Sequence, residues 1–582
     1  MRKDTKSSLE FLFDRLAKHP FISVAAMCVL LFFFGFCDSA NFTAGSYIYG
    51  GAVLMLLFAA LILLGRLGRN LTEMIVIFLV CVGFTVGGLL LIYTYQNSAA
   101  LILWLSLFLL AMLTALLRLT DTLSTRNFIM IMIAAGVMFR FAYVIYTTSS
   151  VRQHDVGFFN WTWGHANYIE YWYNNGLKLP DFDVRTIWQY YHPPLHHWLM
   201  AFFLRILTLF GMEYGTATQA LQFLPFLYSS MLMMVCYRIF GYVKLKGLPL
   251  VVAMAIVCFH PIFAIMGGFY NNDMLCVFLM MLSILLALRW FRKPTMLNII
   301  FLALSVGLGM MAKLNAWMVA PAIAVLFLYV FIKSIKKKKW LGFICEYVVF
   351  GAICAPLGLW WQTRNFLGEY HVPFTYVPYL SASDAQYCGD MSWTERLFDF
   401  GHGQLTFVYD AFSDPNFGAP YNEFNPTVGL FKTALFDEGQ QAISDVHFPQ
   451  IGQTGPMLFW LGVILGVLCF VAFIISMISK KSGVSGIERA FYGVLALTML
   501  GSYYVFCFRF PFTCTMNIRY CVPLIPLFAM GLGLLLKRFS GDTRGQKIFR
   551  YTTYALTACF VLMTLIVYSQ VGMPEPAMPA AI

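Results

Sequence analysis

The stretch RQHDVGFFNWTWGHANYIEYWYNNGLKLPDFDVRTIWQYYHPPL, residues 152–195, decides how this chain is interpreted. It holds Asp155, His192 and several further acids and histidines among many Trp and Tyr residues, whereas the sequence on either side is strongly apolar. A polar, aromatic segment between membrane spans is where a membrane enzyme would keep its reactive groups. We therefore predict that this segment is an active-site loop and that the rest of the chain holds it at the membrane surface.

The composition indicates a membrane protein. Of 582 residues, 60% are hydrophobic and only 11% are charged, whereas a soluble domain carries roughly 25% charged residues. Many apolar runs approach or exceed the roughly 18 to 20 residues that cross about 30 Å of hydrocarbon. We predict an all-α polytopic membrane protein. No small-residue cleavage site follows the first apolar run, so we interpret that run as a retained span.

The net charge of +12 does not indicate nucleic-acid binding, because its distribution follows membrane topology. Basic residues gather in short segments between apolar runs, such as Lys336–Lys339 and Lys480–Lys481. This is the pattern of cytoplasmic loops in membrane proteins. It places the N-terminus in the cytoplasm and the loop 149–192 on the outer side of the membrane.

Apolar runs predict about fifteen spans. They lie near 20–37, 47–66, 74–94, 99–118, 128–147, 217–237, 248–266, 274–290, 297–312, 316–333, 341–361, 457–478, 488–508, 519–537 and 551–570. We divide the chain into a four-span extension (1–126), a core with the catalytic outer loop (127–362), an extracytoplasmic segment (363–455) and a four-span C-terminal segment (456–582).

The run 193–211 is apolar, but we predict that it does not cross the membrane. The basic clusters that follow it become cytoplasmic only if this run stays on the outer side. Arg205 would also cost roughly 2.5–3.5 kcal/mol at mid-bilayer. We expect a juxtamembrane helix in the outer interface; the alternative is a true span combined with a re-entrant run further on.

Four polar groups converge on the predicted outer face. They are His154-Asp155, Tyr190-Tyr191-His192-Pro193-Pro194, Asn271-Asn272-Asp273, and a fourth set made of Lys313-Leu314-Asn315, Arg364-Asn365 and Asn517-Ile518-Arg519-Tyr520. A carboxylate near the membrane surface can accept the proton of a hydroxyl that attacks a sugar carbon. Cationic groups nearby can hold a leaving phosphate. An inverting transfer needs only one base carboxylate.

Together these residues resemble the GT-C class of integral-membrane glycosyltransferases, in the branch of the protein O-mannosyltransferases and the lipid A aminoarabinose transferases. The resemblance rests on Asp155 in the first large outer loop and on five short motifs at 191–195, 271–273, 309–313, 360–365 and 519–526, and it covers about 128–530. It implies a polyprenyl-phosphate sugar donor and an acceptor on the outer side.

The resemblance also implies residue roles. Asp155 corresponds to the catalytic carboxylate and Asp273 to an acid of the second outer turn, while His192 stands where the aminoarabinose branch has a Lys that meets the donor phosphate. Two features depart from the pattern: His154 and Val156 flank Asp155 where the mannosyltransferases have an Asp-Glu pair, and the first four spans have no counterpart.

We therefore predict sugar transfer from a polyprenyl phosphate to an extracytoplasmic acceptor, which could be a protein, wall polymer, lipid or glycan. The expected location is a bacterial plasma membrane, in contact with lipid and without nucleic acid. Asp155 is the predicted general base. The predicted donor-phosphate ligands are Tyr191, His192, Lys313 and Arg519, and the predicted substrate-binding residues are His154, Asn272, Asp273, Arg364 and Tyr520. No metal ligands are assigned; Asp181 and Asp183 have the Asp-x-Asp spacing, which leaves a divalent ion open.

The main alternative is a flippase or transporter for a lipid-linked glycan. A transporter is expected to place ionisable groups within its spans, whereas here they gather at span ends. A non-catalytic scaffold is a third alternative, for which the alignment of four polar groups on one face would be a coincidence.

Overall fold

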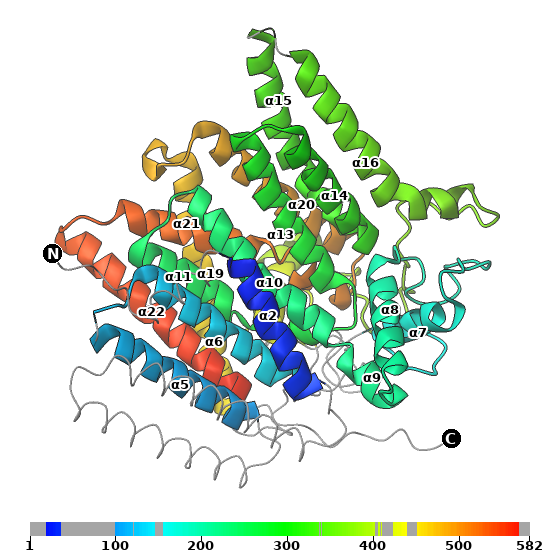
Figure 1. Cartoon of the computed structure of the whole chain (residues 1–582), viewed down its shortest axis with the longest axis horizontal. Helices are drawn as coiled ribbons and strands as arrows, with labels where there is room; N and C mark the ends of the chain where they lie inside the picture. Colours follow the sequence, from blue (N-terminus) through cyan, green and yellow to red (C-terminus); the bar gives the residue numbers. More distant parts are fainter. Residues whose placement is uncertain are drawn as a thin grey trace, which may run out of the picture.

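The computed structural model describes residues 19–36, 99–119, 121–145, 155–336, 338, 340–401, 405–407, 409, 423–438 and 451–569. Within these ranges the chain is built of helices joined by short connections, with no β-strand. The predicted all-α polytopic architecture is confirmed. In Figure 1 the long helices form one bundle, α7, α8 and α9 gather at its right side, and the pair α15 and α16 extends from the top.

The helices of the first half precede or surround the site. They are α2 (Pro20–Leu31), continued by a π-helical turn (Phe32–Phe36), α5 (Ala99–Leu119), α6 (Thr125–Ile145), α7 (Gly164–Asn175), α8 (Leu195–Leu209), α9 (Tyr214–Ala220), α10 (Phe223–Tyr242), α11 (Gly247–Phe259), α12 (Pro261–Ile265), η2 (Met266–Gly268), α13 (Asp273–Arg292) and α14 (Met296–Ala312).

The helices of the second half close the bundle. They are η3 (Leu314–Val319), α15 (Ala320–Lys336), α16 (Trp340–Leu367), α17 (Trp393–Phe398), α18 (Pro426–Phe436), α19 (Ile451–Ile478), η6 (Lys480–Ser482), α20 (Gly486–Arg509), η7 (Thr513–Thr515), η8 (Ile518–Tyr520), α21 (Leu524–Arg538) and α22 (Arg544–Ser569).

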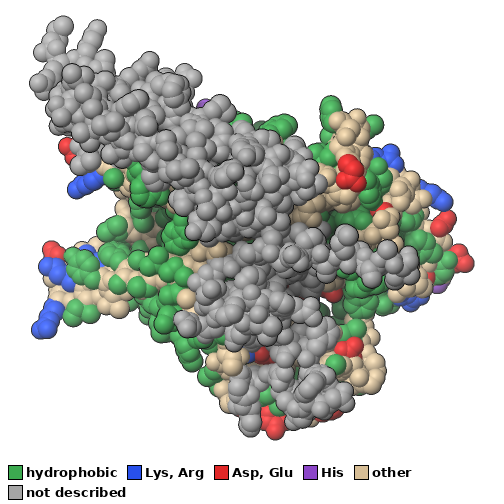
Figure 2. Space-filling model, turned by 90° about the horizontal axis from the view of Figure 1, so that it is seen from below, with side chains coloured by type: hydrophobic (Ala, Val, Ile, Leu, Met, Phe, Trp, Pro, Cys, Tyr) green, Lys and Arg blue, Asp and Glu red, His purple; other side chains and the backbone are tan. Residues whose placement is uncertain are grey.

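Eight helices in the described ranges are long and apolar enough to cross a membrane, or nine if one bent pair forms a single span. The chain is an integral, multi-pass membrane protein. The predicted spans at 47–66 and 74–94 lie outside the described residues, so the number fifteen stays a prediction. Lys and Arg side chains lie at the left and right ends of the face in Figure 2, and hydrophobic side chains lie between them.

The juxtamembrane segment forms α8, a helix of 15 residues. At about 1.5 Å per residue it measures roughly 22 Å, less than the roughly 30 Å of a bilayer core. Phe202, Leu209 and Phe210 are exposed on it, and Arg205 donates to the carbonyl of Tyr173 in α7 at 2.5 Å. By length this helix alone does not cross the bilayer core, and its interfacial position stays a prediction.

The span predicted at 248–266 is not one continuous helix. α11 ends at Phe259, and α12 begins at Pro261 with a bend of 46° between them. Proline lacks an amide hydrogen and disfavours helical geometry in the residue before it. His260 accordingly takes an extended conformation, with φ −66° and ψ 127°. The bend is thus encoded by the His260-Pro261 pair. Hydropathy alone does not predict it, because the residues on both sides of the pair are apolar.

Arg140 of α6 binds the free carbonyl end of α11. Its side chain is fully buried and donates to the carbonyls of Val257 at 3.1 Å and Cys258 at 2.6 Å, as well as to Ser229 Oγ at 2.9 Å. The last carbonyls of a helix lack partners within it and carry partial negative charge. Arg140 therefore satisfies the carbonyls that the bend leaves free.

Replacing Arg140 with Met is expected to destabilise the bundle by about 2–4 kcal/mol, because several buried acceptors would lose their donors. A thermal-unfolding series in detergent would show this as a lower apparent melting temperature. The control is Arg238→Met on α10, where the side chain is exposed. Equal melting temperatures for the two variants would contradict the role given to Arg140.

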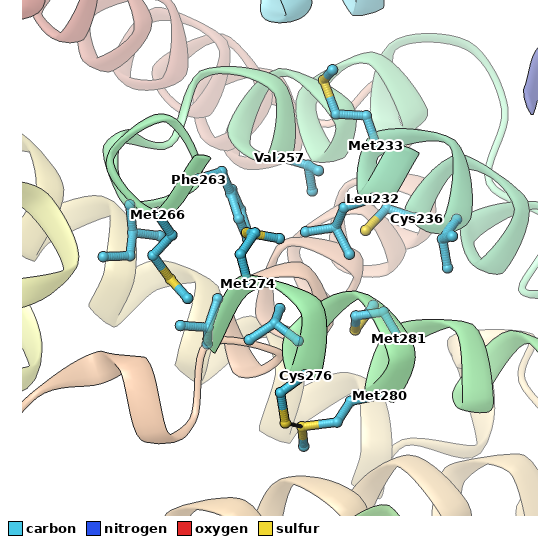
Figure 3. Packing of buried hydrophobic residues seen from close by; sticks show 14 of the residues in the cluster. Leu232, Met233, Cys236, Val257, Phe263, Met266, Met274, Cys276, Met280 and Met281 are labelled. Carbon is cyan, nitrogen blue, oxygen red and sulfur yellow. Dashed lines mark hydrogen bonds between the residues drawn. The ribbon is translucent and has the colours of Figure 1, made fainter. Parts of the chain in front are cut away.

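The core beneath the site is packed by α10, α11, α12 and α13. Figure 3 shows labelled methionine, cysteine, phenylalanine and aliphatic side chains between and around these helices, among them Met233, Val257 and Met274. All three are fully or almost fully buried. Because the helices around the bend are tightly packed, the turn between η2 and α13 is held in place, and it carries Asp273 at the first position of α13.

Candidate active site

A cavity of about 810 Å³ lies between the loops that carry Asp155 and His192 and the ends of α13, α14, α16 and α20. Its lining includes seven of the predicted site residues: Asp155, Tyr191, His192, Asp273, Lys313, Arg519 and Tyr520. These residues come from distant parts of the chain; Asp155 and Arg519, for example, are 364 positions apart. The structure therefore brings together most of the groups that sequence analysis placed on one face.

Asp155 is held by a tight loop. Its backbone has φ +60°, a left-handed conformation that Asp tolerates better than most residues. Its carbonyl accepts from the amide of His165 at 3.1 Å, and the Val156 carbonyl accepts from Ala166 at 2.8 Å. The loop can close because Gly164, at φ +96°, lies against the backbone of Val156, where a Cβ would come within 2.4 Å of the carbonyl oxygen.

Replacing Gly164 with Ala is expected to displace this loop and to lower sugar transfer at least tenfold, because a backbone atom cannot move aside as a flexible side chain can. The control is Gly176→Ala, which shares the positive φ of +65° but has no atom within 4 Å of the new Cβ. A transfer assay on both variants measures the difference. If Gly164→Ala were as active as Gly176→Ala, the loop would not position Asp155.

Arg519 lies between two carboxylates. One guanidinium nitrogen is 3.4 Å from Asp155 Oδ2, and the other is 3.6 Å from Glu438 Oε1. Asn517 donates to Glu438 Oε1 at 2.8 Å and to Asp437 Oδ1 at 2.8 Å. Asn517 thus holds the two acids that follow α18 beside Arg519.

Glu438 is a cavity residue that the sequence analysis did not select. It counted only as one of many acids in the segment 363–455. The one local signal is that Glu438 comes two residues after α18 ends at Phe436, and without the fold nothing connects that point to residue 519. Arg519 and Tyr520 reach the cavity because η8 precedes α21, which begins at Leu524 and not at 519 as the predicted span does.

Lys313 forms the second charged pair. Its ammonium nitrogen is 2.5 Å from Asp273 Oδ1, and both side chains are almost fully buried. The turn before α13 is tied to the end of α14 because Asn272 donates to the Ala312 carbonyl at 2.8 Å. Tyr520 lies between the two cations, 5.4 Å from Lys313 Nζ and 5.1 Å from the Arg519 guanidinium, measured to the ring centre.

Tyr191 and His192 form the wall between these pairs and α16. The Tyr191 carbonyl accepts from the Trp361 indole at 3.1 Å, and the His192 carbonyl accepts from Tyr168 at 3.2 Å. Burial raises the pKa of the Tyr191 hydroxyl, which stays protonated. Burial and the nearby Lys313 charge lower the pKa of His192 to about 3. His192 is therefore a neutral hydrogen-bonding group at pH 7, and not a cation.

Because His192 binds a proton less readily in the folded protein than in the unfolded chain, stability should fall on acidification. The unfolded chain takes up the proton near pH 6.5, so the loss develops from there toward pH 3, by up to about 1.4 kcal/mol per pH unit, and is absent at higher pH. Apparent melting temperatures between pH 8 and 4 measure this. His192→Gln should flatten part of the slope; an unchanged slope would show that other groups cause it.

Two further predicted residues, Asn272 and Arg364, stand apart from the cavity lining. Asn272 is fully buried, and its side chain ties the turn before α13 to the end of α14. Arg364 donates to the Pro180 carbonyl and to Asn365 Oδ1, so it ties α16 to the loop 176–192. His154 lies outside the described residues.

The acids with Asp-x-Asp spacing also lie apart, since Asp183 pairs with Arg185 at 2.6 Å and Asp181 with Lys178 at 3.4 Å. In the described part of the chain, no group of three or more His, Cys, Asp or Glu side chains is placed to hold a metal ion.

Residues 191–361 match the family model described as "Dolichyl-phosphate-mannose-protein mannosyltransferase". The match confirms the predicted resemblance to GT-C glycosyltransferases. It contains Tyr191, His192, Asp273 and Lys313 but not Asp155 or Arg519. No curated protein matches the chain.

Solved structures give a distant likeness. The apo oligosaccharyltransferase of Archaeoglobus fulgidus has 12% identity and a TM-score of 0.43, over 76% of this chain and 56% of that chain. ArnT of Cupriavidus metallidurans, bound to undecaprenyl phosphate, has 11% identity and a TM-score of 0.41, over 77% of both chains. The chain thus spans a little over half the length of the archaeal enzyme.

Proposed function

We propose that this protein is a glycosyltransferase that moves one sugar from a polyprenyl phosphate to an acceptor on the outer side of the membrane. The observation that carries the proposal is the cavity in which Asp155 lies beside Arg519, with the Lys313–Asp273 pair on the same lining. The family match supports a polyprenyl-phosphate donor and a transferase reaction.

Asp155 is the general base in this proposal. Its side chain is 37% exposed, whereas Arg519 and Glu438 beside it are 6% and 5% exposed. A hydroxyl of the acceptor can therefore reach the Asp155 carboxylate, which takes up its proton as the oxygen attacks the anomeric carbon. The bond from that carbon to the phosphate oxygen breaks, and the polyprenyl phosphate leaves. One attack on one face inverts the sugar.

Arg519 and Lys313 bind the phosphate. Both are almost fully buried, so a phosphate that reaches them interacts in a medium less screening than water. Arg519 presents a planar fork suited to phosphate oxygens, and Lys313 presents a compact charge. Tyr191 and the neutral His192 can add hydrogen bonds to the same group. The carboxylates that pair with the two cations keep them in place.

The polyprenyl chain lies along α20. Leu497, Gly501 and Val505 line the cavity, and both Leu497 and Val505 are largely exposed, at 72% and 66%. Residues four apart lie on one side of a helix, so this row forms a continuous apolar path along α20. Trp317 of η3 lines the same cavity and is 44% exposed. A path of this kind suits an isoprenoid tail that stays in lipid while its phosphate reaches the cavity.

The acceptor approaches from the outer segment. Residues 372–378 line the cavity, and Phe374 and Val377 in this stretch are exposed. The stretch is held where Val372 donates to the Asn365 carbonyl at 3.0 Å and where Tyr376 packs edge-on against Tyr191 at 5.7 Å. These contacts support an acceptor that enters along this stretch and reaches Asp155, which lines the same cavity.

The test is release of polyprenyl phosphate by the purified protein from a panel of radiolabelled polyprenyl-phosphate sugars, with a cell-envelope fraction as acceptor. Release from one donor, with label appearing in the acceptor, is the expected result. Binding of the donors without release from any of them would contradict the proposal and favour the transporter.

A further inference from the structure

Two buried amides on the cavity wall have an unsatisfied polar atom. Gln189 is 2% exposed and Gln362 is 8% exposed, and both line the cavity. The side-chain oxygen of each is buried without a hydrogen-bond partner among the residues that the structure describes. Such atoms are rare in folded proteins, because a buried polar atom without a partner costs about 1–3 kcal/mol. Their position on a cavity wall indicates a ligand that donates hydrogen bonds to these oxygens.

The two amides belong to one part of the wall. Gln189 is joined to His192 by a backbone hydrogen bond of 3.2 Å, and Gln362 follows Trp361, whose indole binds the Tyr191 carbonyl at 3.1 Å. Gln189 also has φ +81°, an uncommon conformation for a residue with a side chain. Strained backbone of this kind is often found at ligand sites.

The chemistry of this wall suits an uncharged polyol. A buried amide oxygen needs a hydrogen-bond donor, and the hydroxyls of a sugar supply one. Trp188, Tyr191 and Tyr376 add aromatic surface to the same lining. Ligand sites that combine aromatic walls with a few well-placed polar groups are the usual kind for small molecules.

An amino sugar or a uronic acid would need a charged partner. An amide does not provide one. In this cavity Lys313 is already paired with Asp273, and Arg519 is already paired with Asp155 and Glu438.

We propose that Gln189 and Gln362 bind the hydroxyls of the transferred sugar and that this sugar is uncharged. The inference rests on the proposed function, because it takes the sugar-bearing lipid as the ligand. It deepens that function by naming the class of donor: a polyprenyl-phosphate hexose or pentose without an amino or carboxyl group.

The experiment measures lipid binding without turnover, on the full-length protein carrying Asp155→Asn. Four lipids are compared: bare polyprenyl phosphate and polyprenyl phosphate bearing a neutral hexose, an amino sugar or a uronic acid. We expect the neutral-sugar lipid to bind most tightly. Gln189→Leu or Gln362→Leu, each added to Asp155→Asn, should weaken its binding about three- to tenfold toward the value for the bare lipid. Binding of the bare lipid should stay unchanged.

The matched control is Gln546→Leu, which makes the same chemical change in the first turn of α22, away from the cavity lining. Unchanged bare-lipid binding shows that each variant is folded. Tighter binding of the amino sugar or uronic acid, or equal binding of all four lipids, would overturn the inference while leaving the transferase proposal in place. If Gln189→Leu or Gln362→Leu lowered turnover in protein with Asp155 intact, while binding of the neutral-sugar lipid to the Asp155→Asn forms did not weaken, the amides would bind the acceptor and the donor assignment would be wrong. Failure of the transferase itself appears separately, as absence of release by the wild type.

Discussion

Replacing Asp155 with Asn is expected to lower sugar transfer by about a hundredfold to ten-thousandfold. A positioned base contributes about that factor to a proton transfer, and an amide cannot accept the proton. The substitution keeps the size of the side chain, so the loop that binds His165 and Ala166 should stay intact. The measurement is the initial rate of polyprenyl-phosphate release, with the melting temperature as a check on folding.

The control is Asp181→Asn, which makes the same change in the same outer loop at a side chain that is 75% exposed and outside the cavity lining. It should transfer at the wild-type rate. An active Asp155→Asn variant, within threefold of wild type, would remove Asp155 from the role of base. Glu438, the other carboxylate beside Arg519, would then be the candidate.

Replacing Arg519 with Met is expected to weaken donor binding by at least about thirtyfold. Removing one partner of a buried charge pair costs about 2–5 kcal/mol, and here the change would leave Asp155 and Glu438 without their shared cation. Those two carboxylates would then repel the donor phosphate. Binding of bare polyprenyl phosphate is the direct measurement, because it does not depend on the sugar.

Arg519→Lys separates charge from geometry. It should recover part of the affinity, because the positive charge remains while the planar fork is lost. Arg185→Met is the control, since this arginine pairs with Asp183 outside the cavity lining. Wild-type affinity in Arg519→Met would show that the phosphate binds elsewhere on the wall.

The sidedness of the loops predicted much of the site. Asp155, Asp273, Lys313 and Arg519 all follow or precede apolar runs on the side predicted to be the outer one, and span ends on one side of a bundle have only a small area to share. Their meeting at one cavity could therefore be expected from topology. Which charges pair could not be expected, because nothing local relates residue 155 to residue 519.

Other features of the fold and the site depend on tertiary packing, which the pattern of apolar residues in the sequence does not predict. The bend at His260 interrupts a run that reads as one span, and only the Pro261 that follows it signals the break. Arg364 belongs to one of the short motifs on which the predicted resemblance rests, yet its donors go to Asn365 and to the Pro180 carbonyl. Gln189 and Gln362 are not among the predicted site residues. That their amide oxygens lack hydrogen-bond donors among the described residues can be known only from the folded structure.

The most direct test of the account follows the chemical fate of a sugar-lipid in sealed proteoliposomes. Wild-type protein and Asp155→Asn are reconstituted with a donor labelled in both sugar and lipid, and the acceptor is supplied on one side. The account predicts that wild type separates the two labels, leaving polyprenyl phosphate in the membrane and sugar on the acceptor, whereas the variant leaves them joined. Movement of the intact lipid across the bilayer at equal rates in both proteins, without separation of the labels, would contradict it.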